Sequence, residues 1–251
     1  MAKKVFITGG SRGIGRGIAQ VMAESGYDVA VTYNTAKAEA DSLVDEISAL
    51  GRKAFAFQAS LERDGVAESV TERAVTALGG IDAMVCNAAV TRHHSVLKLE
   101  EDDVTKFFNL VYRSYVMCAK TAANYMVDNN VEGSIVFTTS TRGIRAYPED
   151  ILYGGFKAAL QRSAQSMALD LAKYRIRVNS IAPGMTAVRG NFTPEELSAG
   201  SFPPKIPLGR MGSPREVGYL VDFLCSDKAA YITGNIARID GGLILPGIPE
   251  R

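Results

Sequence analysis

The sequence has 251 residues, of which 47% are apolar and 22% charged, and its formal net charge is +1. This length suits one α/β domain with a single large core. A nearly neutral chain lacks the field that draws a protein to nucleic acid or to an anionic membrane, so we expect neither partner. A small-molecule substrate is the class that remains.

No segment reaches the roughly 18 consecutive apolar residues that a membrane helix needs, and the first apolar run is too short for a signal sequence. These features predict a cytoplasmic protein. Cys86, Cys118 and Cys225 lie in apolar contexts without the spacing of metal ligands. We interpret them as reduced core residues rather than metal or redox groups, and we expect no metal site.

Short runs of β-forming residues alternate with longer segments at helical spacing. The predicted strands are 4–8, 28–33, 53–58, 81–86, 133–139, 177–182 and 236–240. This alternation is typical of a parallel sheet with helices on both faces. It predicts one doubly wound, Rossmann-type α/β domain over residues 1–251, with a mainly parallel sheet of seven strands.

A glycine-rich turn, Thr8 to Gly15, follows the first strand and leads into a helical segment. Free N–H groups and the positive end of a helix dipole face such a turn, and glycines leave room for a pyrophosphate. The turn predicts a dinucleotide site that includes Gly9, Ser11, Arg12, Gly13, Ile14 and Gly15. A tight turn with nothing bound is the alternative, because glycines often punctuate chains.

Further motifs follow in chain order. They are Asn87-Ala88-Ala89 after the fourth strand, Ser140 after the fifth, the pair Tyr153 and Lys157, the stretch from Asn179 to Pro183-Gly184, and Asp240-Gly241-Gly242. This set resembles the short-chain dehydrogenase/reductase family over essentially the whole chain. The resemblance implies an oxidoreductase that transfers hydride between a nicotinamide cofactor and a secondary alcohol or its carbonyl.

The resemblance assigns catalysis to Ser140, Tyr153 and Lys157. Tyr153 and Lys157 are four residues apart, so they share one face of a helix. A free tyrosine has a pKa of about 10, and we expect Lys157, with a positively charged nicotinamide ring, to lower it. Tyr153 would then be the general acid in reduction and the base in oxidation, while Ser140 binds the substrate oxygen. Taken alone, such a pair is more often a surface tyrosine and a solvated lysine, and only the neighbouring motifs favour the catalytic interpretation.

The resemblance also extends the cofactor site beyond the glycine turn. It adds Asn34, Ser60, Leu61, Asn87, Ala88, Tyr153, Lys157, Pro183, Gly184 and Thr186. Members that use NAD tend to carry an aspartate at the end of the second strand, where this chain has Tyr33-Asn34-Thr35. Because Arg12 is basic and no carboxylate repels a 2′-phosphate, we expect NADP rather than NAD. An ordinary exposed loop charge is the alternative for Arg12.

The family usually carries an asparagine in its fourth helix, which helps to hold a proton-relay water. Asn109 is a candidate, but placing residues 87–120 on the family pattern without gaps puts this slot at Val111. A shift of two residues rotates a side chain by about 200°, so Asn109 would point away unless the helix is bulged. The sequence leaves both positions open, and we omit Asn109 from the catalytic set.

The segment 185–213 is rich in proline and lacks periodicity, which predicts a mobile flap over the substrate. The family's pocket-lining segments carry polar side chains here: Arg92, His93, His94, Arg142, Arg145, Tyr147 and Arg189. Arginines that face the pocket would favour keto acids or sugar-derived ketones. Most such arginines are solvated surface charges, and here Glu149 and Asp150 could also pair with them.

Two other functions are compatible with parts of the sequence. A non-catalytic dinucleotide sensor would keep the fold, although the retained serine, tyrosine and lysine argue against it. A sugar-nucleotide epimerase of the extended branch would need a larger domain after Pro183. The family commonly assembles through its fourth and fifth helices, and the apolar segment 243–249 is too hydrophobic for a free terminus. We therefore expect a homodimer or homotetramer.

Overall fold

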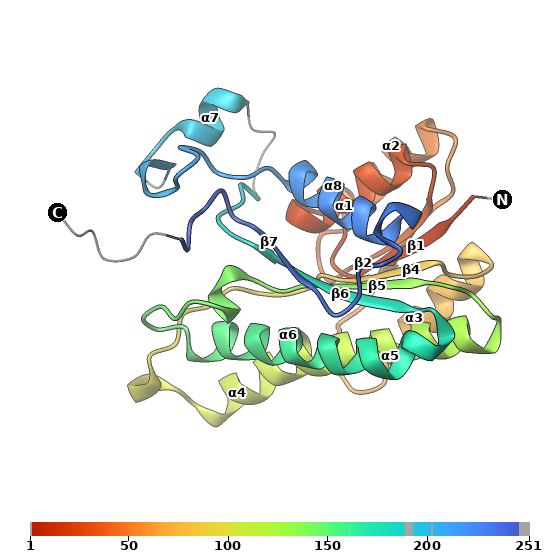
Figure 1. Cartoon of the computed structure of the whole chain (residues 1–251), viewed down its shortest axis with the longest axis horizontal. Coiled ribbons are helices and arrows are strands. Elements are labelled where there is room, and N and C mark those ends of the chain that lie inside the picture. Colours follow the sequence, from red (N-terminus) through yellow and green to blue (C-terminus); the bar gives the residue numbers. More distant parts are fainter. Residues whose placement is uncertain (1, 189–192, 202, 246–251) are drawn as a thin grey trace.

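The computed structural model describes residues 2–188, 193–201 and 203–245, and its centre is one parallel sheet of seven strands (Figure 1). The strands are β1 (Lys4–Ile7), β2 (Asp28–Tyr33), β3 (Ala54–Gln58), β4 (Ala83–Cys86), β5 (Ser134–Thr138), β6 (Arg177–Pro183) and β7 (Ile236–Ile239). Each predicted strand is present, with small differences at the ends. The predicted doubly wound sheet is therefore confirmed.

The strand order in the sheet is β3-β2-β1-β4-β5-β6-β7. The central neighbours β1 and β4 are far apart in sequence, because the chain builds outward to β3 and then returns to the middle. In such a sheet, ligands bind outside the carboxyl ends of the strands, near the point where the order reverses. The topology thus predicts a ligand site at the loops after β1 and β4.

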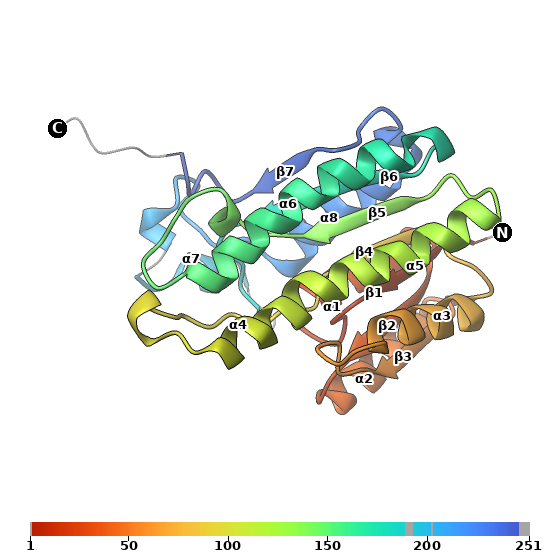
Figure 2. The same cartoon turned by 90° about the horizontal axis from the view of Figure 1, so that it is seen from below.

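Helices cover both faces of the sheet (Figures 1 and 2). One face carries α1 (Gly13–Glu24), α2 (Lys37–Ala49) and α8 (Pro214–Cys225), and the other carries α3 (Val66–Leu78), α5 (Ser114–Asp128) and α6 (Ile151–Leu171). Because parallel strands are buried on both faces, they consist mainly of apolar residues. None of the described helices is both long and apolar enough to cross a membrane.

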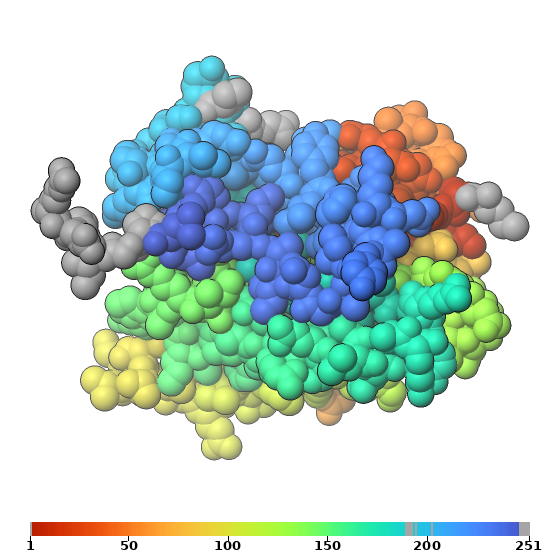
Figure 3. Space-filling view, in the orientation of Figure 1, coloured from red at the N-terminus to blue at the C-terminus, as the bar shows by residue number. Residues whose placement is uncertain are grey.

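The segment 185–213 contains more regular structure than the sequence indicated. The short helix α7 (Pro194–Ser198) begins with a capping box formed by Thr193 and Glu196, and a 3-10 turn spans Pro203–Lys205. A proline at the first helical position starts a helix rather than interrupting it. The segment lies beside the chain that follows β7 (Figure 3), where the Leu208 N–H donates to the Gly241 carbonyl at 3.1 Å.

The three cysteines are free and buried, as the sequence indicated. Burial raises the pKa of Cys118 and of Cys225 to about 12. Each thiol therefore stays protonated at neutral pH, which suits a core residue rather than a nucleophile. Within the described part of the chain, no three His, Cys, Asp or Glu side chains gather in a way that would hold a metal ion.

Candidate active site

The loop after β4 is tied to the glycine loop after β1. The backbone N–H groups of Asn87 and Ala88 donate to the Thr8 hydroxyl at 2.8 and 3.1 Å. The Asn87 amide donates to the carbonyl oxygens of Thr8 and Gly9 at 3.1 and 3.2 Å. These bonds fix two predicted cofactor segments against each other at the carboxyl edge of the sheet.

The close packing and the backbone conformation of the loop require glycine at several of its positions. A Cβ on Gly15 would lie 2.1 Å from the Gly9 carbonyl oxygen, and a Cβ on Gly10 would lie 2.4 Å from Val31. Gly9 and Gly13 have φ values of +66° and +55°, a backbone conformation that side chains disfavour. The loop therefore needs glycine before any ligand is considered.

The amino end of α1 faces this loop without an acidic partner. Arg12 is the N-cap residue, but its side chain makes no capping bond, and no acidic residue lies in the first turn of α1. The first N–H groups of a helix have no partner within the helix and carry partial positive charge. This end of α1 is therefore a suitable site for a phosphate group.

The predicted adenosine end lies at the carboxyl ends of β2 and β3. The Ser60 hydroxyl donates to the Asn34 side-chain oxygen at 3.2 Å, and Gln58 donates to the Asn34 carbonyl at 2.9 Å. Leu61 is only 3% exposed and its side chain packs in the core. Any contact that Leu61 makes with a cofactor must therefore come from its backbone.

Pro183 and Gly184 lie at the end of β6, where the chain after β7 closes around them. The Gly184 N–H donates to the Ile239 carbonyl at 2.9 Å, and a Cβ on Gly184 would lie 2.6 Å from the Cβ of Asp240. Thr186 forms an isolated parallel bridge with Gly212. This bridge joins the two ends of the segment 185–213 beside the candidate site.

Ser140 is held against α6 at the end of β5. Gln161 donates to the Ser140 carbonyl at 3.1 Å and to the Thr139 hydroxyl at 3.2 Å. The Ser140 hydroxyl oxygen accepts the N–H of Arg142 at 3.1 Å, so its own proton is left to donate. Two bonds from different elements thus position the predicted substrate-binding hydroxyl.

The structure brings the three predicted catalytic residues together. Tyr153 lies in the first turn of α6 and Lys157 one turn later, with the Lys157 Nζ 5.6 Å from the Tyr153 ring centroid. The Ser140 side chain forms a hydrogen bond with the Tyr153 hydroxyl, which favours the phenolate form of Tyr153. Serine, tyrosine and lysine therefore form one cluster at the carboxyl edge of the sheet, the edge that also carries the glycine loop.

The expected acidification of Tyr153 by Lys157 is absent in the chain alone. Burial raises the pKa of Tyr153, and hydrogen bonds from Ser140 and Thr91 offset this only in part. Burial also lowers the pKa of Lys157 to about 7, so at neutral pH this lysine is only partly charged. The protein therefore keeps Tyr153 protonated, which is the form that donates a proton in a reduction.

Comparison with known proteins extends this pattern to the whole chain. A family model described as enoyl-(acyl carrier protein) reductase matches residues 9–244. The chain belongs to the short-chain dehydrogenase/reductase family. It is thus an oxidoreductase of a family that uses a nicotinamide cofactor.

Three relatives illustrate the range of this family. A 3-oxoacyl-(acyl-carrier-protein) reductase FabG of Staphylococcus aureus is 33% identical over 250 residues, which are 98% of this chain and 99% of the relative. An L-rhamnose 1-dehydrogenase (NAD(P)(+)) of Sphingomonas is 34% identical over 243 residues, 96% of each chain. The crystal structure of acetoin dehydrogenase from Enterobacter cloacae, 32% identical, superposes with a TM-score of 0.93 and covers 100% of this chain and 99% of that one.

This short-chain dehydrogenase/reductase has a bulge in the helix that carries the family's asparagine position. The helix α4 (Glu101–Phe107) continues as one π-helical turn, Phe108–Arg113, before α5 begins. Val111 is fully buried in the core, whereas Asn109 is half-buried and its side chain forms no hydrogen bond within the described residues. The inward position is thus apolar, despite the bulge.

Tyr115, which the sequence analysis did not single out, contacts Lys157 instead. The Lys157 Nζ donates to the Tyr115 hydroxyl at 3.0 Å and to the Thr138 carbonyl at 2.6 Å. Tyr115 lies one helical turn after Val111. The sequence did contain a signal for this contact, namely an apolar residue at the asparagine position and a tyrosine one turn later. The signal can be interpreted only when the position of the helix relative to β5 and Lys157 is known.

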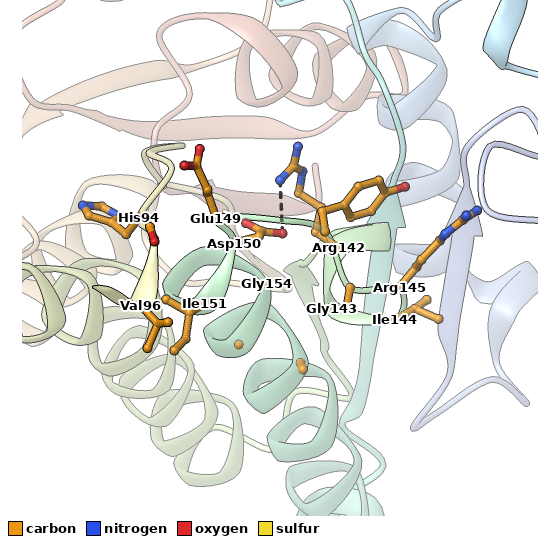
Figure 4. Close-up of a pocket in the computed structure, with 15 residues that line it drawn as sticks. His94, Val96, Arg142, Gly143, Ile144, Arg145, Glu149, Asp150, Ile151 and Gly154 are labelled. Atoms are coloured by element: carbon orange, nitrogen blue, oxygen red, sulfur yellow. Dashed lines mark ion pairs between the residues drawn. The ribbon is translucent and has the colours of Figure 1, made fainter. Parts of the chain in front are cut away.

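A pocket of about 550 Å³ lies beside the amino end of α6 (Figure 4). Among the predicted polar residues, His94, Arg142, Arg145 and Tyr147 line it, together with Glu149 and Asp150. Arg92 and His93 are exposed and lie outside the lining, and Arg189 lies outside the described residues. Four of the polar residues that the sequence named thus line this pocket, whose lining does not include Ser140, Tyr153 or Lys157.

The charge of Arg142 is paired within the protein. Its guanidinium lies 3.1 Å from a carboxylate oxygen of Asp150, whose side chain is 3% exposed, and it also stacks over the Tyr147 ring at 4.9 Å. The pairing with Asp150 that the sequence left open is the one observed. Arg142 and Asp150 together present a polar but nearly neutral wall to the pocket.

Proposed function

We propose that the protein is an NADP(H)-dependent oxidoreductase that transfers hydride between nicotinamide and a secondary alcohol or its carbonyl. The observation that carries this proposal is the cluster of Ser140, Tyr153 and Lys157 at the carboxyl edge of the sheet. The test is turnover of a panel of ketones and alcohols with NADPH, NADH and their oxidised forms. A protein that binds cofactor but turns over none of them would instead be a non-catalytic sensor.

The chain offers a site that fits the phosphates of a dinucleotide, because the amino end of α1 has free N–H groups and no acidic residue. The residues that would hold the cofactor are Gly9, Ser11, Arg12, Gly13, Ile14, Gly15, Asn34, Ser60, Leu61, Asn87, Ala88, Tyr153, Lys157, Pro183, Gly184 and Thr186. When bound, nicotinamide supplies or accepts the hydride.

The side chains of the cluster divide the remaining work. Ser140 donates a hydrogen bond to the carbonyl oxygen of the substrate, because its own oxygen already accepts the Arg142 N–H. Tyr153 donates the proton to that oxygen as charge develops there, and it takes the proton back in the oxidation. Lys157 provides positive charge near the Tyr153 ring, which stabilises the phenolate left after proton transfer.

Cofactor choice gives a first prediction. Arg12 is exposed at the amino end of α1, and Asn34 brings no negative charge to the end of β2. NADPH should bind more tightly than NADH, and Arg12→Ala should narrow the gap by about 1 to 3 kcal/mol, as expected for a lost charged hydrogen bond. Titration of both cofactors measures this, with Arg52→Ala at the opposite edge of the sheet as the control. Equal affinities in the unmutated protein would contradict it.

The pocket wall supports a neutral, hydroxylated carbonyl compound as the substrate. Arg142 and Asp150 offer both donors and acceptors, but their charges largely cancel. Two of the relatives are named for rhamnose and acetoin, which are both neutral and hydroxylated. We propose that polar carbonyls, including sugar-derived ketones, are better substrates than aliphatic ketones of similar size.

A variant separates these substrate classes. Asp150→Asn keeps the shape of the side chain and leaves the Arg142 charge unpaired, so a keto acid should gain kcat/KM over a neutral hydroxyketone by about 1 to 3 kcal/mol. Glu149→Gln, which alters an exposed pocket residue, is the matched control. If aliphatic ketones are preferred, or if Asp150→Asn leaves selectivity unchanged, this side of the pocket does not bind the substrate.

We also propose that the protein is cytoplasmic and forms a dimer or tetramer of two-fold symmetry. The rings of Phe108 and Tyr112 stack on each other, and the Phe156 ring of α6 packs against both at a tilt. Phe108 is 41% exposed. The apolar segment 243–249, also expected to pack, is described only as far as Leu245. Light scattering that finds monomer alone at micromolar concentration would contradict the assembly.

A further inference from the structure

The ammonium group of Lys157 is buried with two protein acceptors. Lys157 and Tyr115 are each 1% exposed. The Lys157 Nζ donates to the Thr138 carbonyl at 2.6 Å and to the Tyr115 hydroxyl at 3.0 Å. A buried charge requires such partners, because the water that would otherwise solvate it has been removed. These two oxygens therefore control whether Lys157 can hold its proton.

Tyr115 is placed rigidly for this contact. Its ring packs edge-on against Phe137 of β5, with centroids 5.6 Å apart, and its face lies 4.7 Å from the Lys157 Nζ. Its hydroxyl also donates to the Thr138 carbonyl, at 3.3 Å. Burial raises the pKa of Tyr115, so the phenol stays neutral and its oxygen is free to accept from Lys157.

No acidic side chain takes part in this arrangement. The titratable groups that face Lys157 are Cys86 from β4, Tyr115 from α5 and Tyr153 from its own helix. Burial raises the pKa of Cys86, so this thiol is neutral as well. Among the described residues, no carboxylate forms an ion pair with Lys157. Its charge therefore rests on neutral acceptors.

We propose that Tyr115 is the positioning residue that holds the ammonium group of Lys157 beside Tyr153, in a chain that has Val111 where the family places an asparagine. Val111 offers no polar atom, and Tyr115 reaches Lys157 from the next turn of the same helix. The inference rests on the proposed function, because Lys157 supports catalysis only if Tyr153 transfers the proton.

The first test is the pH profile of Tyr115→Phe, which removes one oxygen and keeps the ring. Without this acceptor the charged form of Lys157 is less stable, so its pKa falls further. The variant should lose about tenfold in kcat at pH 8 but at most about twofold at pH 5.5, where Lys157 stays protonated in both proteins. A purely structural role would lower kcat by the same factor at both pH values, and that result would overturn the proposal.

The control is Tyr112→Phe. It removes a hydroxyl from the preceding turn, where Tyr112 shares a hydrogen bond of 3.0 Å with Ser163 and has no contact with Lys157. Its pH profile should match that of the unmutated protein. A loss in Tyr112→Phe as large and as pH-dependent as in Tyr115→Phe would show that any change in this helix produces the effect, which would also overturn the assignment.

A second measurement is independent of turnover. Nuclear magnetic resonance with lysine labelled at 13Cε follows the titration of Lys157 in the cofactor-free protein, and Lys157→Met identifies its signal. Tyr115→Phe should lower the pKa of Lys157 by about one unit, while Tyr112→Phe should leave it unchanged. An unchanged Lys157 pKa in Tyr115→Phe overturns the proposal. If the unmutated protein turns over no carbonyl compound, the proposed function fails, and this titration still decides whether Tyr115 holds Lys157.

Discussion

Replacing Tyr153 with phenylalanine should reduce turnover by about two to four orders of magnitude while cofactor affinity stays within a few fold. The substitution removes the hydroxyl that we propose as the proton donor and leaves the ring to pack against its neighbours. Because burial raises the pKa of Tyr153, the hydroxyl is protonated at neutral pH and can serve as the acid that we propose, and the substitution removes it. Initial rates of ketone reduction measure the effect.

The matched control for this prediction is Tyr174→Phe. Tyr174 lies in the 3-10 turn that follows α6 and is 43% exposed, at the end of the helix remote from Tyr153. Its loss of a hydroxyl should leave turnover unchanged. Retention of most activity by Tyr153→Phe would remove the general acid from the mechanism and would favour a different donor in the cluster.

The features that the sequence predicted well are those that depend on local pattern. Each strand is a short run of β-forming residues, and β5 is buried along its whole length, so periodicity and composition identify it. The resemblance named Ser140, Tyr153 and Lys157, of which two share a helix face and the third follows β5 by two residues. Each of these signals is a short motif that can be read without knowing which distant segments it contacts.

The features that the sequence did not predict depend on contacts between distant segments. The contact between Tyr115 and Lys157 joins two helices, and the close approach of Gly10 to Val31 joins the glycine loop to β2. The raised pKa of Tyr153 in the cofactor-free chain was not anticipated, because burial, which no motif reports, outweighs the hydrogen bonds from Ser140 and Thr91. The helix α7 was missed because a single turn and a half is too short to show periodicity.

Replacing Lys157 with methionine should stabilise the fold at neutral pH even as it impairs turnover. The unfolded chain holds the lysine proton until about pH 10.5, whereas in the folded chain burial lowers the pKa of Lys157 to about 7. Folding near neutral pH therefore forces a charge into the interior or releases its proton, and either costs free energy. A methionine of similar length avoids this cost, and the Tyr115 hydroxyl can still donate to the Thr138 carbonyl.

The pH dependence of this effect has a definite sign. Between pH 7 and pH 9 the unfolded state binds the Lys157 proton and the folded state mostly does not, so the free energy of unfolding of the unmutated protein rises with pH. Above pH 10.5 the lysine is neutral in both states and its burial carries no charge cost. This cost grows as the pH falls toward 7, so the free energy of unfolding falls with it. The free energy of unfolding of the unmutated protein, taken relative to that of Lys157→Met, should therefore rise by about 2 kcal/mol between pH 7 and pH 9. Urea unfolding followed by far-ultraviolet circular dichroism measures both proteins. Burial raises the pKa of Cys86 and of Tyr153, so both groups stay protonated in the folded state of either protein over this range and contribute little to the difference. A difference that stays constant over this range would mean that Lys157 keeps its ordinary pKa, and that the interior around Tyr115 and Thr138 solvates the ammonium group as well as water does.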